Sequence, residues 1–296
     1  VSDRFTLLKV GRWAKQNKVA NLVFSHETLN GLVRKYAPIV PASIRNKFVN
    51  WHNAKLAATF DNVIATTDFA AAEFVRIKTN NLRKVALGVD LIGFTPENRN
   101  YKLRKELLKG AEFLLVHCGR MSPEKQPERS VQALAELIKR GVNARLIIVG
   151  GGPLWNKVRK QSTGLPVDMV GYIASRQKVA DYLAAADLAI APGPLETFCL
   201  SALESLASGT PVVASKSSAV GEILNVNSIK AAGAVAADDG LSFANEIIKL
   251  LNKGNLRKVA RNQAEQYSWA NTIDAMLDIH GAKQPMVTTK RRLKAA

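Results

Sequence analysis

The sequence of 296 residues contains little cysteine and few aromatic residues. Its two cysteines, Cys118 and Cys199, lie in apolar surroundings and outside any CxxC pair, which favours buried structural thiols in a reducing cytoplasm. Aromatic residues make up 6% of the chain and few of them lie among the basic clusters, so stacking sites for single-stranded nucleic acid are not favoured. We therefore expect no nucleic-acid partner.

Long apolar runs and metal-binding motifs are missing as well. The sequence contains no run of about 18 uninterrupted apolar residues, so no transmembrane helix is predicted. No signal peptide is visible either. There is no DxD motif and no histidine cluster, so a metal site is not expected. The chain begins at Val1 in sequence typical of a domain interior, and we expect that an N-terminal segment is missing.

Positive charge is abundant. Lysine and arginine number 42 against 24 acidic residues, for a net charge of +18, and residues 283–294 carry five basic residues with no acidic one. Such a surface attracts phosphates, nucleic acid or anionic lipid headgroups. A generally basic proteome or a solvated tail would give the same composition. An anionic membrane surface is therefore one candidate partner.

Apolar strands alternate with amphipathic helices along most of the chain. We expect strands at 19–24, 62–66, 84–87, 111–118, 144–149, 168–170, 187–191 and 211–214. We expect helices at 44–60, 70–77, 128–140, 154–160, 177–186, 200–208, 241–253 and 255–267. This alternation predicts an α/β fold with parallel sheets covered on both faces, and ligands at the carboxyl ends of the strands.

Two cations follow the predicted strand 111–118. Arg120 comes directly after Gly119, and Lys125 lies in the same loop before the helix 128–140. Arginine binds a phosphate through two parallel hydrogen bonds and lysine acts as a point charge, so the pair suits a diphosphate. The alternative is a solvated loop with ordinary charges.

A glycine-rich turn, Gly150-Gly-Gly-Pro153, connects the next strand to its helix. Such a turn lets the backbone approach a phosphate or a base. Gly150 and Gly152 fit the dinucleotide pattern GxGxxG, but Trp155 stands where the third glycine belongs. A tight turn that holds no ligand fits equally well.

Two glutamates eight residues apart give the strongest signal. Glu196 lies in the loop after the strand 187–191, and Glu204 lies within the helix 200–208, for which we predict Thr197 as the N-cap. The N-terminus of that helix favours an anion. Carboxylates hydrogen-bond the hydroxyls of sugars and ribose, and two carboxylates can also act as an acid/base dyad. The structural alternative is that Glu196 caps a helix and Glu204 pairs with a lysine.

The stretch from Gly119 to Glu222 resembles the donor-binding domain of the family 4 retaining glycosyltransferases, which have the GT-B fold. The matching elements occur in the family's order: Gly119-Arg120, Glu124-Lys125, Val149-Gly-Gly-Gly-Pro153, Gly171-Tyr172, Ala186-Asp187, Glu196 with Glu204, and Ser208-Gly-Thr-Pro-Val-Val213. Upstream, Ser25-His26-Glu27, Thr66-Thr67 and Leu87-Gly-Val-Asp90 are similar to the late part of the family's N-terminal domain.

The resemblance implies two Rossmann-like, doubly wound domains, of which the N-terminal one is incomplete. Residues 1–94 would be the partial acceptor-side domain and 95–110, which are polar and charged, a linker. Residues 111–266 would be the donor domain, and 267–296 a crossing helix with a basic tail. The family's first strand and glycine-rich loop would precede Val1. The fragment would then bind nucleotide, and two alternatives stay open: it transfers a sugar, or it is inactive in transfer.

The resemblance also implies roles for single residues. Arg120 and Lys125 match the diphosphate-binding pair, Glu196 the acid that contacts the donor sugar, and Glu204 the acid that binds ribose. His26 matches an inter-domain histidine near the transferred sugar. Catalysis would fall to His26, Arg120, Lys125 and Glu196. Donor binding would also involve Gly119, Gly151, Phe198, Cys199 and Leu200, with Cys199 where glycine is common.

Within the family, the Ser-His-Glu element and Pro192-Gly-Pro-Leu-Glu-Thr-Phe198 look most like actinobacterial mannosyltransferases that act on phosphatidylinositol mannosides. The implied donor is GDP-mannose, with no cofactor, and the acceptor a glycolipid or glycan. The implied location is the cytoplasm, at the inner face of the plasma membrane. The alternatives are a UDP- or ADP-sugar donor in the same family, a noncatalytic nucleotide-binding module, and a dinucleotide binder.

Overall fold

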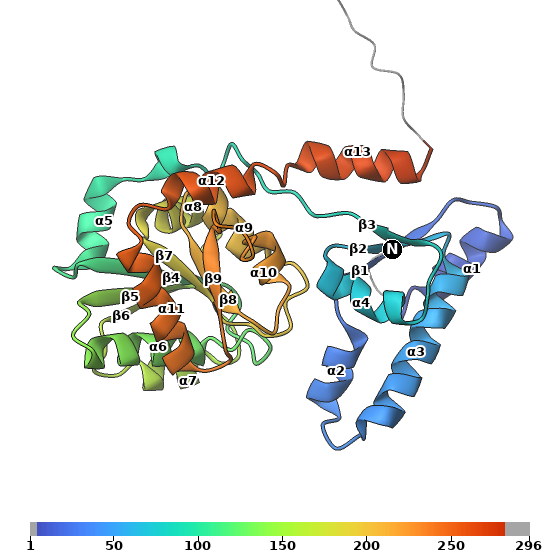
Figure 1. Cartoon of the computed structure of the whole chain (residues 1–296), viewed down its shortest axis with the longest axis horizontal. Helices are drawn as coiled ribbons and strands as arrows, with labels where there is room; N and C mark the ends of the chain where they lie inside the picture. The colour runs from blue at the N-terminus through green and yellow to red at the C-terminus, as the bar shows by residue number, and fades with distance from the viewer. Residues whose placement is uncertain (1–4, 282–296) are drawn as a thin grey trace, which may run out of the picture.

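The structure is a computed structural model that describes residues 5–281, and it consists of two α/β units side by side (Figure 1). The N-terminal unit has a sheet in the order β1-β2-β3, and the C-terminal unit has a sheet in the order β6-β5-β4-β7-β8-β9. All the strand pairs are parallel. The predicted α/β class with parallel sheets is confirmed.

The N-terminal unit contains α1 (Leu8–Gln16), β1 (Leu22–Ser25), α2 (Leu29–Tyr36), α3 (Ala42–Thr59), β2 (Asn62–Ala65), α4 (Asp68–Arg76) and β3 (Leu82–Lys84). Helices α3 and α4 bury Leu56 and Phe74 against Val23 and Val63 of the sheet. A strand was predicted at 84–87, but β3 ends at Lys84 because the chain then leaves the sheet. The Ala86 carbonyl accepts a hydrogen bond from Thr272 near the C-terminus.

The C-terminal unit contains strands and helices in regular alternation. Its strands are β4 (Phe113–Cys118), β5 (Ala144–Val149), β6 (Val167–Gly171), β7 (Leu188–Ala191), β8 (Val212–Ser215) and β9 (Gly233–Ala236). Its helices are α6 (Glu128–Lys139), α7 (Trp155–Gln161), α8 (Arg176–Ala185), α9 (Leu200–Ala207), α10 (Val220–Ile223), α11 (Gly240–Asn252) and α12 (Arg257–Ala264). Since β4 lies between β5 and β7, the strand order reverses there, and a crevice is expected at the carboxyl ends of β4 and β7.

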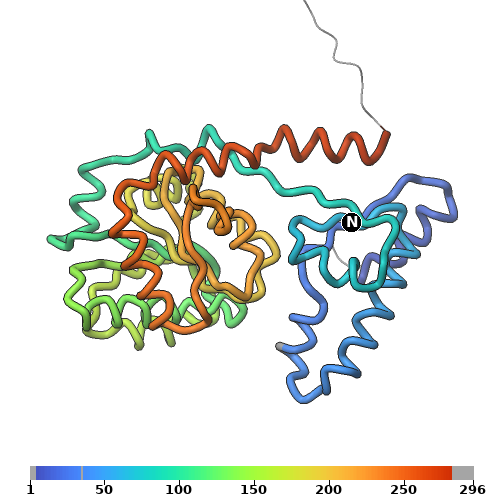
Figure 2. The backbone as a smooth tube through the Cα atoms, in the orientation of Figure 1, coloured from blue at the N-terminus to red at the C-terminus, as the bar shows by residue number. Residues whose placement is uncertain are grey.

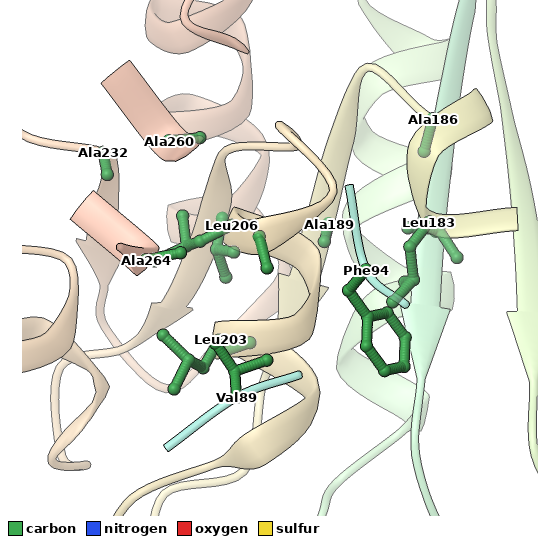
Figure 3. Close-up of a cluster of buried hydrophobic side chains, with 14 of the residues drawn as sticks. Val89, Phe94, Leu183, Ala186, Ala189, Leu203, Leu206, Ala232, Ala260 and Ala264 are labelled. Atoms are coloured by element: carbon green, nitrogen blue, oxygen red, sulfur yellow. The ribbon is translucent and has the colours of Figure 1, made fainter. Parts of the chain in front are cut away.

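Each face of the larger sheet is covered by its own hydrophobic core. On one face α6 and α11 pack through buried residues such as Leu134 and Phe243. On the other face α8, α9 and α12 pack together, and Figure 3 shows Val89 beside Leu203 within this cluster. The connection from the N-terminal unit is therefore part of the core that carries α9.

Residues 95–110 are a packed part of the C-terminal unit rather than the predicted linker. They include the short 3₁₀ helix η1 (Pro96–Asn98) and α5 (Tyr101–Leu108). Arg99 and Arg104 form ion pairs with Asp187 at 3.2 and 2.8 Å, and both also donate to carbonyls at the end of α8. Two of the charges on which the linker was predicted therefore bind this segment to the C-terminal unit. The other domain boundaries stay predictions.

Two crossing segments connect the units. Residues 85–95 run beside the start of α13 (Trp269–Ile279), as the tube in Figure 2 shows. The Val89 amide donates to the Tyr267 carbonyl at 2.9 Å, and a Cβ on Gly88 would lie 2.3 Å from the Trp269 amide nitrogen. Only glycine therefore fits at position 88.

Helix α13 returns the chain to the N-terminal unit, where Met276 and Ile279 pack against Leu22 and Ile64. The crossing helix predicted after Tyr267 therefore lies where the resemblance implied. The basic tail predicted at 283–294 lies outside the described residues. Within residues 5–281 we find no helix that is long and apolar enough to cross a membrane.

Candidate active site between the two units

A cleft of about 720 Å³ lies between the units, at the carboxyl ends of β1, β4 and β7. The N-terminal unit contributes His26, Leu32 and Tyr36 to its lining. The predicted site residues that line the cleft are His26, Gly119, Arg120, Lys125, Glu196, Phe198, Cys199 and Leu200. Gly151 and Glu204 are not among the lining residues. The fold therefore brings most of the predicted site together around one cavity.

Lys125 and Glu196 form an ion pair inside the cleft. Their side chains are 34% and 12% exposed. Burial lowers the pKa of Lys125, but the Glu196 carboxylate outweighs it, and the pKa is raised. Lys125 therefore remains charged at neutral pH, and it holds Glu196 in place from the neighbouring loop.

Arg120 is exposed at the mouth of the cleft, directly after β4. Within residues 5–281 no carboxylate forms an ion pair with its guanidinium. Arg120 carries five N–H donors and lines the same cleft as Lys125. An anionic ligand is the natural complement of this arrangement.

The glycine-rich turn supports the loop that carries Arg120. The Met121 amide donates to the Gly151 carbonyl at 2.9 Å. A Cβ on Gly150 would lie 1.9 Å from the Gly119 carbonyl oxygen, and one on Gly152 would lie 2.5 Å from that of Met121. Both glycines have positive φ, of 132° and 154°. The glycines are thus explained by close packing of two loops, and Gly151 lies against Met121.

Thr197 is not the N-cap that the sequence predicted. Helix α9 begins at Leu200, and its N-cap residue is Cys199, which has a left-handed φ of 69°. Glycine adopts that conformation without strain, which explains why glycine suits this position. The Thr197 hydroxyl instead donates to the His26 carbonyl of the other unit.

The Thr197 carbonyl makes a second connection between the units. It accepts hydrogen bonds from the hydroxyls of Thr66 and Thr67, at 3.1 and 2.8 Å. Two threonines at the end of a predicted strand are the only sequence signal for this contact. Because Thr197 lies between Glu196 and Phe198, the contact between the units is built into the loop that lines the cleft.

Glu222 also joins the two units, a contact that no motif in the sequence predicted. Its carboxylate accepts hydrogen bonds from the amides of Asp68 and Phe69, both at 2.8 Å. These amides lie in the first turn of α4, where a negative charge is favoured. A glutamate of the C-terminal unit therefore caps a helix of the N-terminal unit.

Two histidines line the cleft. The His26 ring stacks on Phe24 with centroids 5.4 Å apart, and desolvation lowers its pKa although the Glu27 charge opposes this. His117, to which sequence reasoning gave no role, is buried at the end of β4, with Nδ1 2.9 Å from the Ser130 hydroxyl. Burial and the Lys125 charge lower the pKa of His117 to about 4. Both imidazoles are therefore neutral at pH 7.

Glu204 is largely buried in α9, and its nearest cation is Arg176 at 3.6 Å. Burial raises its pKa, while Arg176 opposes the shift. The partner of Glu204 is therefore an arginine and not the lysine of the structural alternative.

Burial raises the pKa values of Cys118 and Cys199 to about 12, so neither is a thiolate. No group of acidic, histidine and cysteine side chains within residues 5–281 is arranged to hold a metal ion.

Comparison with known proteins identifies the family. The family model described as "Glycosyl transferases group 1" matches residues 98–267. The chain is a group 1 glycosyl transferase. It is 43% identical over 284 residues to a GDP-mannose-dependent alpha-(1-6)-phosphatidylinositol dimannoside mannosyltransferase of Mycobacterium tuberculosis, covering 95% of this chain and 73% of the relative. It is 29% identical to a D-inositol 3-phosphate glycosyltransferase of Saccharomonospora viridis, over 76% of this chain and 56% of that protein.

Solved structures show the same fold in this glycosyltransferase. HepE of Anabaena in complex with UDP matches with a TM-score of 0.77 at 18% identity, covering 95% of this chain and 77% of that one. Sucrose-phosphate synthase of Thermosynechococcus elongatus matches with a TM-score of 0.75 at 23% identity, covering 93% and 70%. The predicted family and the GT-B fold are confirmed.

Proposed function

We propose that this glycosyltransferase moves mannose from GDP-mannose to a phosphatidylinositol-mannoside acceptor, with retention of configuration. The observation that carries the proposal is the 43% identity, over 95% of the chain, to the mycobacterial mannosyltransferase whose name specifies this donor and acceptor. The cleft adds chemical support, because it places two cations and a carboxylate around a cavity large enough for a nucleotide sugar.

The diphosphate of the donor is bound by Arg120 and Lys125. Their charges stabilise the negative charge that develops on the leaving nucleotide, which is the kind of electrostatic contribution that commonly dominates catalysis. The backbone amides from Phe198 to Leu200, at the start of α9, add hydrogen-bond donors with a favourable helix dipole. Gly119 and Gly151 belong to the loops that hold this group of donors in position.

Glu196 accepts hydrogen bonds from hydroxyls of the donor sugar, and the ion pair with Lys125 links the sugar contact to the phosphate contact. The resemblance assigns the ribose to Glu204, although Glu204 is not among the residues that line the cleft. His26, neutral at pH 7, hydrogen-bonds the transferred sugar from the opposite unit. Because Glu196 forms an ion pair with Lys125, it is not free to act as a nucleophile. We therefore propose that the nucleotide departs and the acceptor attacks on the same face of the sugar. A covalent mannosyl adduct on Glu196, detected by mass spectrometry of quenched enzyme, would overturn this mechanism.

We further infer that the enzyme works at the inner face of the plasma membrane and binds no nucleic acid. A lipid acceptor requires the cleft to reach a lipid surface, and the net charge of +18 attracts an anionic one. Adding nucleic acid as a competitor should leave GDP binding unchanged at physiological salt.

Calorimetric titration with GDP, UDP, ADP and NAD tests the donor assignment. GDP should bind most tightly, and Arg120→Ala should weaken it by roughly ten- to a hundredfold, since a hydrogen bond to a charged group contributes about 1.5–3 kcal/mol. Arg159→Ala, an exposed cation of α7 outside the cleft, is the matched control and should bind GDP normally. Preference for UDP or ADP would change the donor, and binding of NAD alone would refute the proposed function.

A further inference from the structure

Strand β4 buries a polar ring on its face toward α6. Alternate residues of a strand point to the same face, and on β4 Phe113 and Leu115 pack into the core formed with α6 and α11. His117 is the next residue of that series and is 3% exposed. A leucine or valine here would extend the core without the cost of burying a polar group. Packing alone therefore does not explain an imidazole at this position.

The two ring nitrogens of His117 have different surroundings. Nδ1 lies 2.9 Å from the hydroxyl of Ser130, a fully buried residue of α6. Nε2 is buried as well, and it has no hydrogen-bond partner among residues 5–281. Buried polar atoms in folded proteins are nearly always paired, because leaving one unpaired is destabilising. The unpaired Nε2 therefore indicates a partner in a bound ligand.

Gly119 leaves space between Nε2 and the cleft. Both His117 and Gly119 line the cleft. A Cβ on Gly119 would lie 3.9 Å from Nε2, and within the described part of the chain no other atom outside the adjacent residues would lie within 4 Å of it. A ligand atom can therefore occupy the space that a side chain at position 119 would fill, and from there it can reach Nε2.

The charges around His117 favour Nε2 as a hydrogen-bond donor. Burial and the Lys125 charge lower the pKa of His117 to about 4, so the ring is neutral at pH 7. A neutral imidazole donates from one nitrogen and accepts at the other. When the Ser130 hydroxyl donates to Nδ1, Nε2 carries the proton. A donor suits a cleft in which Arg120 and Lys125 attract an anion, whereas a lone pair on Nε2 would repel the same anion.

We propose that His117 is a third residue that binds the donor diphosphate. Its Nε2–H donates to a phosphate oxygen that lies against Gly119, and Ser130 is the positioning residue that fixes the ring and its tautomer. The identity of the ligand as a nucleoside diphosphate rests on the proposed function. His117 adds a hydrogen bond to the cations Arg120 and Lys125 without adding a charge.

Three substitutions at position 117 test the role of Nε2. Glutamine places an amide N–H close to the position of Nε2, asparagine places one close to Nδ1, and phenylalanine keeps the ring without a hydrogen bond. In calorimetric titration, His117→Phe and His117→Asn should bind GDP at least about tenfold more weakly than the wild type, and His117→Gln should bind it within about threefold. A role in packing alone predicts the opposite order, with phenylalanine tolerated best.

The matched control is Thr210→Val, in the same unit but before β8, at the end of the sheet away from the cleft. It removes a buried hydroxyl that donates to the Leu183 carbonyl at 2.7 Å. This variant should lose stability in thermal melting and still bind GDP like the wild type. Ser130→Ala, which removes the partner of Nδ1, should weaken GDP binding by less than His117→Phe.

Nitrogen-15 NMR of the imidazole tests the tautomer. Nε2 should carry the proton at pH 7, and the resonance of this proton should move downfield when GDP is added, as expected for a hydrogen bond to a phosphate. An Nε2 without a proton in the GDP complex would overturn the proposal.

Equal GDP affinity of His117→Phe and the wild type would also overturn it. Normal GDP affinity with slower transfer from GDP-mannose would place the contact at the sugar and would likewise contradict the diphosphate assignment. Binding of UDP in place of GDP would contradict the proposed donor alone. Because UDP carries the same diphosphate, the variants would then be titrated with UDP, and the same order of affinities is expected.

Discussion

The two units differ in the size of their sheets and in their balance of charge. The C-terminal unit has a six-stranded sheet, two complete hydrophobic cores and nearly balanced charge, with 18 basic and 14 acidic residues in 111–266. The N-terminal unit has a three-stranded sheet, and residues 4–60 contain ten basic residues and only one acidic one. The positive charge of residues 4–60 therefore lies in a different unit from the cations that we assign to the donor.

The two units also differ in how their charged side chains are arranged. In the C-terminal unit, several cations are held by carboxylate partners, as Lys125 is by Glu196 and Arg145 by Asp168. In the N-terminal unit, cations such as Lys47 lie on the same helices as exposed apolar side chains such as Trp51. The units are joined by hydrogen bonds of the Thr197 loop and of Glu222.

The largest effect is expected when the donor chemistry of the C-terminal unit is broken. Glu196→Gln should lower kcat by about 10²–10³, because a preorganised polar contact in the site and the Lys125 ion pair are lost together. Steady-state transfer kinetics measure this, with Glu136→Gln on the outer face of α6 as control. A variant with nearly normal kcat would show that Glu196 contacts neither the sugar nor Lys125 during the reaction.

An intermediate effect concerns the acid stability of the C-terminal unit alone. The pKa of His117 is lowered from 6.5 to about 4, so the unfolded chain binds a proton at a higher pH than the folded one. Stability should therefore fall as the pH drops from about 6.5 to about 4, by up to about 3 kcal/mol for this residue.

Denaturant unfolding at pH 7 and pH 5 measures this loss. His117→Gln cannot titrate in this range, so its stability should change less between the two pH values. An equal change in the variant and the wild type would contradict the assignment of the acid sensitivity to this buried ring.

The smallest effect is expected at the joint between the units. Thr197→Val removes the hydroxyl that donates to the His26 carbonyl and keeps the shape of the side chain, so it should cost about 1 kcal/mol. We expect kcat/KM to fall about fivefold and small-angle scattering to show a larger radius of gyration. Thr163→Val, on the exposed surface after α7, should change neither quantity.

Buried strands and the loops that follow them were the most predictable features. The strand at 144–149 was predicted with the bounds that the structure has, because a strand buried on both faces is a continuous apolar run. The cleft residues were predictable because they follow such strands. The short strand β9, Gly233–Ala236, was missed because four small residues give no periodic signal.

Features that depend on distant partners were not predictable. The start of α2 is capped by Glu73, whose carboxylate accepts from the Leu29 and Asn30 amides 44 and 43 residues away. Thr197 was predicted to cap its own helix because its partner, the His26 carbonyl, is 171 residues distant in the sequence. Local patterns describe local hydrogen bonds, whereas these contacts exist only once both units have formed.

The most direct test of the account is transfer of labelled mannose from GDP-mannose to phosphatidylinositol dimannoside in anionic vesicles. The account predicts label in the lipid fraction, with the α configuration of the donor retained. A product of inverted configuration, or incorporation from a UDP-sugar but not from GDP-mannose, would contradict it.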